Sequence, residues 1–344
     1  MTRTLVTGGS GFIGQHLVAA LLAQGCRVRV LDVRTPSYAS AGAQYVKGSV
    51  LDAKLVYEAL DGVAEVYHLA ALPGMWMRFK NDFHDVNCRG TEIVLEAARK
   101  RCVSRFLHCS TESILFGSPP LESSAIDVVT TPVEMPGVYT RSKFAAEQRA
   151  LQAAAYGFPV IIANPTMPIG PHYGNLTPPT LMLRYFINRR VQVYLDFVLN
   201  LVDVRDVTAG LLLAMERGQS GHRYILGGEA ISLGKLLKAV RAVTGRKALR
   251  VPIPAEIART TAAIMELVSD HVTHRPPAGT VEGVRIALRS QPLSIEKSRR
   301  DLGYAPNPIG PALRETVASF VGWPGEPTSW SVPIGRRNLR SHDA

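Results

Sequence analysis

A glycine-rich turn near the N-terminus is the feature that most limits what this chain can fold into. Gly8, Gly11 and Gly14 recur at intervals of three, directly after a short apolar run and directly before a helical pattern. Glycine lets the backbone turn tightly and approach a pyrophosphate closely, and the helix N-terminus presents free N–H groups and a positive dipole end. In this strand–turn–helix setting the spacing predicts a dinucleotide site. Its expected residues are Gly8, Gly11, Phe12, Ile13 and Gly14.

Beyond this turn, the first half of the chain alternates short β-branched runs with helical periodicity. Such alternation is typical of a parallel sheet that is covered by helices on both faces. We therefore expect an α/β fold with a Rossmann-type doubly wound parallel sheet. The expected strands are Thr4–Thr7, Arg27–Leu31, Gln44–Val46, Glu65–His68, Arg105–Cys109 and Val160–Ala163, and the expected helices are Phe12–Gln24, Ala53–Leu60, Cys88–Arg101 and Val138–Tyr156.

Asp32 closes the second expected strand, 18 residues after Gly14. A carboxylate at this position can accept hydrogen bonds from both adenosine ribose hydroxyls, and it repels a 2′-phosphate. The position therefore favours NAD over NADP as the cofactor. Arg34, two residues later, leaves NADP open, because a nearby arginine can accommodate the phosphate.

The second half of the chain has a different pattern, with prolines and glycines clustered at 164–179 and 252–254. Helical patterns cover 179–190, 206–217, 232–244 and 255–272, and we expect three short apolar pieces to return to the sheet. These pieces are Val191–Leu195, Leu201–Val204 and Arg223–Leu226. The pattern predicts an NAD-binding domain at 1–165 with sheet returns near 191–228, a smaller interleaved substrate-binding cap at 166–325, and a flexible tail at 326–344.

Charge and composition restrict the class of partner. Hydrophobic residues make up 46% and charged residues 19% of the chain, as in ordinary globular proteins. The net charge of +11 lies mostly in residues 151–344, which carry 23 Lys/Arg against 14 Asp/Glu. A basic surface can attract an anionic substrate, a nucleic acid or a membrane surface. No basic stripe is interleaved with aromatics, so no nucleic-acid partner is expected, whereas peripheral membrane contact, with helix 255–272 as its candidate, stays open.

Membrane-spanning and metal-binding classes find no support in the sequence. No run of 18 apolar residues occurs, so no transmembrane segment is expected. Cys26, Cys88, Cys102 and Cys109 are scattered without C-x-x-C spacing, which favours a reducing, cytoplasmic location and gives no zinc pattern. No metal site is expected.

Tyr139 and Lys143 are four residues apart in a helical stretch, which places both on one helix face. Tyrosine has an ordinary pKa of about 10 and is a poor base at neutral pH, and a neighbouring ammonium favours the phenolate. We expect Lys143 to lower the pKa of Tyr139. Tyr139 then exchanges a proton with a substrate hydroxyl or carbonyl while hydride moves to or from nicotinamide. This is the chemistry of an oxidoreductase that acts on a secondary alcohol or ketone.

Together these residues resemble the extended short-chain dehydrogenase/reductase superfamily, also called the NAD-dependent epimerase/dehydratase family, over roughly residues 3–325. The resemblance implies that Thr7 and the three glycines form the family's loop. It also implies that Tyr139 and Lys143 are the catalytic pair, with Lys143 also holding the nicotinamide ribose. On this basis the cofactor set gains Asp32, Ser49, Val50, Leu69, Ala70, Ala71, Asn87, Tyr139, Lys143 and Pro165.

Two positions depart from the family pattern. Gly48 is followed by Ser49, where the family usually has an aspartate that contacts adenine, and Asp52 is expected to cap the next helix instead. The position of the family's catalytic hydroxyl also has two alignments. Counting back from Gly117 gives Glu112, and counting from the strand end gives Thr111; we take Thr111 as the catalytic hydroxyl.

A narrower resemblance appears later in the chain, at Asn164–Pro171, Leu199–Val204 and Tyr224–Glu229. These segments are similar to hopanoid-associated sugar epimerases, near dihydroflavonol reductases and 3β-hydroxysteroid dehydrogenases. Two enzyme functions therefore stay open: a dehydrogenase or ketoreductase, and an NAD-retaining nucleotide-sugar epimerase or dehydratase. A non-catalytic NAD sensor is disfavoured, because a sensor needs no proton relay. The resemblance also implies a homodimer formed through Cys88–Arg101 and Val138–Tyr156.

The substrate region gives a weaker signal. A nucleotide sugar needs cationic donors on two phosphates, yet segment 194–200 has no arginine and contains Asp196. Arg184, Arg189 and Arg190 lie upstream of it. Aromatic residues at Trp76, Phe79, Tyr185, Phe186 and Phe197 favour an apolar pocket, so we expect a small-molecule substrate without a nucleotide diphosphate. The expected substrate contacts are Trp76, Thr111, Glu112, Asn164 and Phe186.

Overall fold

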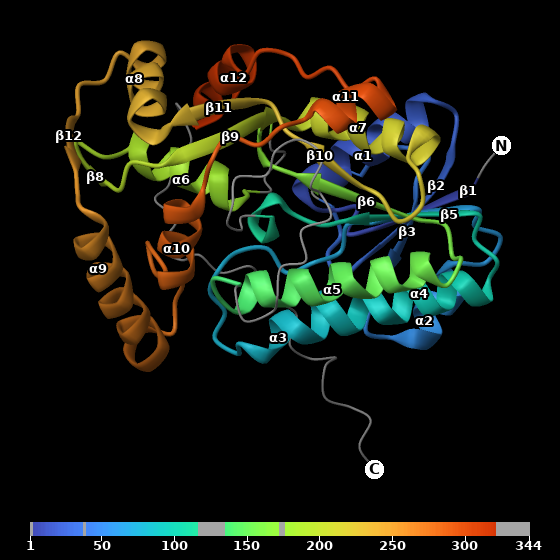
Figure 1. Cartoon of the computed structure of the whole chain (residues 1–344). Helices are drawn as coiled ribbons and strands as arrows, with labels where there is room; N and C mark the ends of the chain where they lie inside the picture. The colour runs from blue at the N-terminus through green and yellow to red at the C-terminus, as the bar shows by residue number, and fades with distance from the viewer. Residues whose placement is uncertain (1–2, 37–38, 116–134, 172–175, 321–344) are drawn as a thin grey trace.

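The computed structural model describes residues 3–36, 39–115, 135–171 and 176–320. A seven-stranded sheet lies at its centre, and every neighbouring pair of strands in it is parallel (Figure 1). The strand order is β10-β6-β5-β4-β1-β2-β3, so the direction of winding reverses between β1 and β4. Ligands of such sheets bind at this reversal, outside the carboxyl ends of the strands. The strands are β1 (Arg3–Thr7), β2 (Arg27–Asp32), β3 (Gln44–Lys47), β4 (Glu65–His68), β5 (Arg105–Cys109), β6 (Val160–Pro165) and β10 (Arg223–Leu226).

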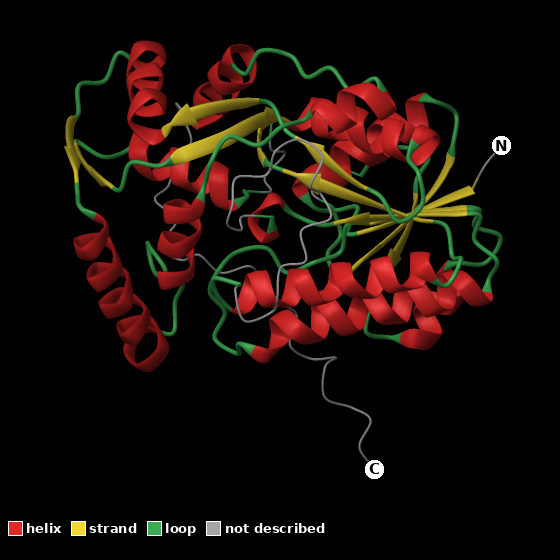
Figure 2. Cartoon of the chain, viewed as in Figure 1, coloured by secondary structure: helices red, strands yellow, loops and turns green. Residues whose placement is uncertain are grey.

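Helices cover both faces of this sheet, with α4 and α5 side by side on one face and α1 and α7 on the other (Figure 2). Neighbouring strand residues point to opposite faces, so Leu5 enters one apolar core and Val6 enters the other. The predicted α/β doubly wound fold is confirmed. The covering helices are α1 (Phe12–Ala23), α2 (Ala53–Ala59), α3 (Asn81–His84), α4 (Gly90–Lys100), α5 (Val138–Ala155), α7 (Val204–Arg217) and α11 (Glu296–Leu302).

A second body with its own apolar core is built from later segments of the chain. One three-stranded sheet has the order β11-β9-β7, and one two-stranded ribbon pairs β12 with β8. The predicted return of Val191–Leu195 and Leu201–Val204 to the main sheet is therefore wrong, and only Arg223–Leu226 joins it. The elements are β7 (Met167–Ile169), α6 (Pro178–Ile187), β8 (Val191–Tyr194), β9 (Val198–Asp203), β11 (Glu229–Ser232), α8 (Leu233–Thr244), β12 (Leu249–Pro252), α9 (Ala255–Val268), α10 (Val281–Arg289) and α12 (Gly310–Phe320).

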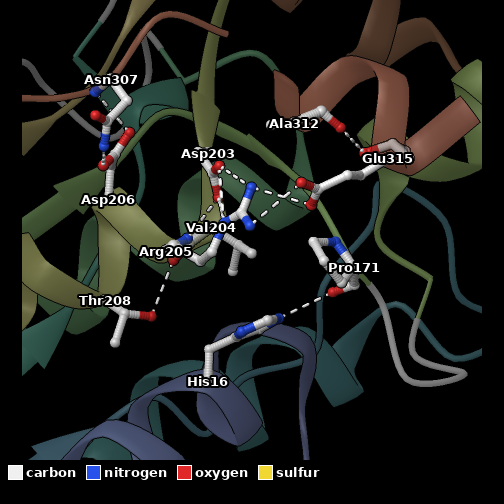
Figure 3. A network of polar contacts seen from close by, with 11 residues as sticks. His16, Pro171, Asp203, Val204, Arg205, Asp206, Thr208, Asn307, Ala312 and Glu315 are labelled. Atoms are coloured by element: carbon white, nitrogen blue, oxygen red, sulfur yellow. Dashed lines mark hydrogen bonds and ion pairs between the residues drawn. The ribbon is translucent and has the colours of Figure 1, made fainter. Parts of the chain in front are cut away.

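Polar contacts join the two bodies where β9 runs into α7 (Figure 3). Asp203 ends β9 and binds the guanidinium of Arg205 at 2.6 Å, and Arg205 also reaches Glu315 of α12 at 3.1 Å. His16 of α1 shares a hydrogen bond of 2.9 Å with the carbonyl of Pro171. These contacts fix the second body, which we call the cap, to the helices of the main sheet. A site formed between the cap and the main sheet is therefore held on both sides.

Two predicted helices have irregular ends in the structure. The helix expected at Cys88–Arg101 starts earlier, with α3 and a π-helical turn at Asp85–Arg89 before α4. The helix expected at 255–272 is α9 followed by a π-helical turn at Ser269–Thr273. No helix in the described part of the chain is long and apolar enough to cross a membrane. The expected tail at 326–344 lies outside the described residues.

Candidate active site

The glycine turn lies between β1 and α1, at the reversal point of the sheet. Gly8 has a φ of +72°, and a Cβ on it would come within 2.7 Å of the backbone N of Ala70. Only glycine fits this close approach in a left-handed conformation. Gly11 is the N-cap of α1, and no side chain of the described residues caps this helix. The first-turn N–H groups of α1 are thus directed to where a pyrophosphate would bind.

Asp32 lies at the carboxyl end of β2, beside this turn. Its buried carboxylate accepts hydrogen bonds from the backbone N–H groups of Ser10 at 3.0 Å and Arg34 at 2.9 Å. These bonds fix the carboxylate next to the loop, which is the geometry needed for a ribose contact. The turn, the open helix end and the fixed carboxylate fit an adenine dinucleotide.

The residues that follow β3 and β4 lie on the same side of the candidate cofactor site as Asp32 and the glycine turn. Ser49 Oγ accepts from the N–H of Leu51 at 3.1 Å, and Asp52 caps α2 through the N–H of Leu55 at 3.0 Å, as predicted. The N–H of Ala70 donates to Thr7 Oγ1 at 3.3 Å, which holds the Leu69–Ala71 loop against the end of β1.

Asn87 connects the loop after β4 to the helix that carries Tyr139. Its Oδ1 accepts from the N–H of Leu72 at 2.7 Å, and its Nδ2 donates to Ser142 Oγ at 2.9 Å. The side chain is buried. Asn87 thus sets the distance between the cofactor loop and α5.

Tyr139 of α5 lies near Thr111 at the carboxyl end of β5, close enough for the Thr111 hydroxyl to influence the pKa of the phenol. Burial raises the pKa of Tyr139 to about 12, and the nearby Thr111 hydroxyl opposes that rise. Lys143 is also buried, and its Nζ donates to the carbonyl of Cys109 at 2.9 Å. The expected lowering of the Tyr139 pKa is therefore not seen in this structure, because loss of solvent raises it and Lys143 is not among the groups that act on it. The phenol carries its proton at neutral pH.

Glu112 is buried next to Thr111, and burial raises the pKa of its carboxyl to about 8, with the nearby Asn200 amide opposing the rise. Its Oε2 has no hydrogen-bond partner among the described residues. At neutral pH the carboxyl is mostly protonated. Glu112 is therefore a neutral neighbour of Thr111 and Tyr139 in this site.

Glu282 is a buried residue of this site that the sequence did not reveal. From α10 its carboxylate accepts the backbone N–H groups of Tyr139 at 3.1 Å and Thr140 at 2.7 Å, and the Thr140 hydroxyl at 2.7 Å. The N-cap of α5 is Gly137, which has no side chain to bind these donors. Glu282, on α10 of the second body, thus supplies the acceptor that Gly137 lacks. It lies 142 residues from Thr140 in the chain, so no local sequence pattern could have indicated this contact.

The predicted substrate residues have unequal access to the site. Trp76 donates from Nε1 to Asp270 at 2.7 Å, so it joins the loop after β4 to the turn after α9. Asn164 is fully buried and donates to the carbonyl of Thr111 at 3.2 Å and to Glu147 at 2.9 Å. Phe186 packs inside the cap core. Asn164 and Phe186 therefore support the site's framework, and neither has an exposed surface for a substrate.

This fold and this site define a dinucleotide-dependent oxidoreductase of the extended short-chain dehydrogenase type, with the cofactor loop at the sheet reversal and a tyrosine–lysine pair behind it. The chain belongs to the NAD-dependent epimerase/dehydratase family, whose profile matches residues 4–227. NAD is accordingly its cofactor.

Similar proteins span almost the whole chain. A provisionally named dihydroflavonol 4-reductase of Synechocystis sp. is 34% identical, covering 92% of this chain and 93% of that protein. A 4-hydroxy-2-methyl-3-oxo-4-farnesyl-3,4-dihydroquinoline-1-oxide ketoreductase of Stigmatella aurantiaca is 32% identical, covering 88% and 92%. Among solved structures, the protein in the crystal structure of gox2253 shares 30% sequence identity with this chain at a TM-score of 0.77. The match covers 93% of this chain and 98% of that protein.

Proposed function

We propose that this enzyme is a ketoreductase or dehydrogenase of a lipophilic small molecule without a nucleotide diphosphate, with Thr111, Tyr139 and Lys143 as its catalytic residues. The observation that carries the proposal is the bond from Lys143 Nζ to the carbonyl of Cys109 at 2.9 Å, which holds α5, with Tyr139 one turn before Lys143, against the end of β5 where Thr111 follows. Burial raises the pKa of the Tyr139 phenol to about 12. A protonated phenol is the form that donates to a ketone oxygen during reduction.

Each of these side chains has a separate task in the proposed reaction. Thr111 orients the substrate oxygen toward Tyr139, and Tyr139 gives its proton to that oxygen. Lys143, fixed by the carbonyl of Cys109, holds positive charge beside the pair and in reach of the nicotinamide ribose. NAD, when bound, supplies the hydride in reduction and takes it up in oxidation.

The substrate class is supported by the chemistry of the cap. Segment 194–200 brings no arginine, and its Asp196 accepts the N–H of Gly234 at 2.9 Å inside the cap. Two phosphates need several convergent donors, which these residues do not supply. The relative from Stigmatella aurantiaca is named for a farnesylated ketone, which also favours a lipophilic substrate.

The test is thermal stabilisation of the NAD-loaded protein, followed by NADH oxidation, against a panel of apolar ketones and a panel of UDP-, GDP- and dTDP-sugars. We expect stabilisation and turnover with one or more ketones. A shift with a nucleotide sugar and with no ketone would replace this proposal by the epimerase alternative.

The wider setting of the enzyme is also part of this proposal. We propose that residues 1–165 bind NAD, that the later cap binds substrate, and that the chain works in the cytoplasm, meeting a membrane surface peripherally. Two copies would pair through α4 and α5, which lie side by side on an outer face (Figure 1) and are linked by an Arg149–Glu92 ion pair of 2.6 Å. Light scattering after gel filtration tests the dimer, and a monomeric mass would rule it out.

A further inference from the structure

Helix α9 has its apolar side outward. Its buried residues are the small Ala258 and Ala262, while Ile257 is 53%, Ile264 57% and Leu267 60% exposed. A surface helix normally turns its large apolar side chains to the core. The same exposed side continues through Val268 and into the following turn at Val272.

The two-stranded ribbon beside α9 repeats this arrangement. Val191 pairs with Leu249 and Val193 pairs with Val251, so these four side chains share one face of the ribbon, and all four are exposed. The ribbon and α9 lie along the same outer edge of the molecule (Figure 1), and β12 leads almost directly into α9. Ten of the 17 large apolar side chains exposed in the described part of the chain lie on these elements. We call this surface the α9 edge. Its apolar residues are Val191, Val193, Leu249, Val251, Ile257, Ile264, Met265, Leu267, Val268 and Val272.

Basic residues predominate in the chain around the ribbon of the α9 edge, whereas α9 itself carries Glu256, Arg259 and Glu266. Residues 230–255 contain six Lys/Arg and no Asp/Glu. Asp270, in the π-helical turn after α9, accepts from Trp76 and Lys80, which turns this carboxylate toward the main body. An apolar surface flanked by cations complements the headgroups and upper acyl chains of an anionic bilayer.

A cavity of about 590 Å³ lies next to the ribbon, and Lys235, Lys238 and Arg250 line it. Leu249 belongs both to this cavity and to the apolar face of the ribbon. The Nη1 of Arg250 is buried and has no hydrogen-bond partner among the described residues. The lining also includes one carboxylate, Asp196, which is engaged by the N–H of Gly234. The cavity thus offers donors for a phosphate at the level where the apolar face ends.

We infer that the α9 edge is a docking surface for an anionic phospholipid bilayer, with α9 and the ribbon entering the headgroup region and the Lys235–Lys238–Arg250 cavity taking a lipid phosphate. The inference rests on the proposed peripheral membrane contact and gives it a surface and a lipid class. It would place the cap of the enzyme at the source of a lipophilic substrate.

Vesicle co-sedimentation of the full chain tests this, with vesicles of phosphatidylcholine alone and of phosphatidylcholine mixed with phosphatidylglycerol. We expect binding to the mixed vesicles that is at least about tenfold stronger than to the neutral ones and that weakens with salt. Ile264→Asp with Leu267→Asp should weaken it at least about tenfold, and Lys238→Gln with Arg250→Gln about 10- to 30-fold. The matched controls, Tyr156→Asp at the 82%-exposed end of α5 and Arg99→Gln with Lys100→Gln on α4, should bind like the unaltered protein.

Thermal melting with and without NAD confirms that each variant is folded. Failure of the unaltered protein to sediment with the mixed vesicles would overturn the inference, as would equal binding of the Ile264→Asp, Leu267→Asp protein. A dimer that this double variant dissociates, without vesicle binding, would assign the surface to a second copy instead. Vesicle binding is read without turnover, so a negative result leaves the ketoreductase proposal in place.

Discussion

Replacement of Glu282 is the sharpest test of how the cap supports the catalytic helix. In Glu282→Ala, the backbone N–H groups of Tyr139 and Thr140 lose their acceptor, whereas the Thr140 hydroxyl keeps the carbonyl of Gly137 at 3.2 Å. An unsatisfied buried donor costs about 1–3 kcal/mol. The hydrogen bond from the Tyr139 N–H to Glu282 is only partly buried, so water can replace the acceptor there. Burial also raises the pKa of the Glu282 carboxyl, and this desolvation cost disappears with the side chain.

These contributions together give an expected loss of about 2–3 kcal/mol in the free energy of unfolding. Glu282→Gln keeps one carbonyl acceptor and should lose about half as much. The first turn of α5 carries Tyr139, so kcat should fall in both variants and more strongly than NAD affinity, since the hydrogen bonds of Glu282 go to Tyr139 and Thr140 and not to the glycine loop or Asp32.

Urea unfolding gives the stability change, and initial rates with NADH give kcat and KM separately. Glu256→Ala, an exposed acid in the first turn of α9, is the matched control and should stay within about 0.5 kcal/mol of the unaltered protein. If Glu282→Ala were as stable and as active as this control, the carboxylate would not be holding α5, and the reasoning from its three hydrogen bonds would fail.

Three further predictions concern cofactor choice, catalysis and pH. Asp32→Ala should narrow the preference for NAD(H) over NADP(H) in a binding titration, and tighter NADPH binding by the unaltered protein would contradict the role of Asp32. Tyr139→Phe should lower turnover by roughly 10²-fold or more with little change in NAD binding. Thr111→Val should lower turnover less, and Glu112→Gln should lower it least. If Glu112→Gln lowered turnover more than Thr111→Val, Glu112 would be the catalytic position. Because the pKa of Glu112 is raised from 4.5 to about 8, the folded state holds the extra proton between these values, so stability should fall as pH rises from about 4.5 to 8. Between pH 5 and pH 8, Glu112→Gln should abolish up to about 4 kcal/mol of this fall in the free energy of unfolding, as measured by unfolding curves at the two pH values. If the free energy of unfolding changed with pH equally in both proteins, Glu112 would not be buried as described.

The sequence determined the sheet, the glycine loop and the shared helix face of Tyr139 and Lys143 because each is encoded locally. A glycine turn is specified by its own spacing and flanking elements, as at Gly8, Gly11 and Gly14. A parallel strand buried on both faces shows as an apolar run, and the six strands predicted in the first half are all present within two residues at either end. Tyr139 and Lys143 share a helix face by spacing alone. The Asp52 cap is likewise a contact within three residues.

Only the tertiary structure decided features that join distant segments. Whether Val191–Leu195 extends the main sheet or pairs with Leu249–Pro252 depends on which strand edge is available, and the apolar pattern is the same in both cases. The Glu282 contact with α5 joins residues 142 positions apart, and the side-chain pattern of neither segment encodes it. The pKa of Tyr139 is raised by burial in the assembled site, and the spacing of Tyr139 and Lys143 could not show that burial. In each case the deciding quantity is proximity or solvent exclusion, and both exist only once the chain has folded.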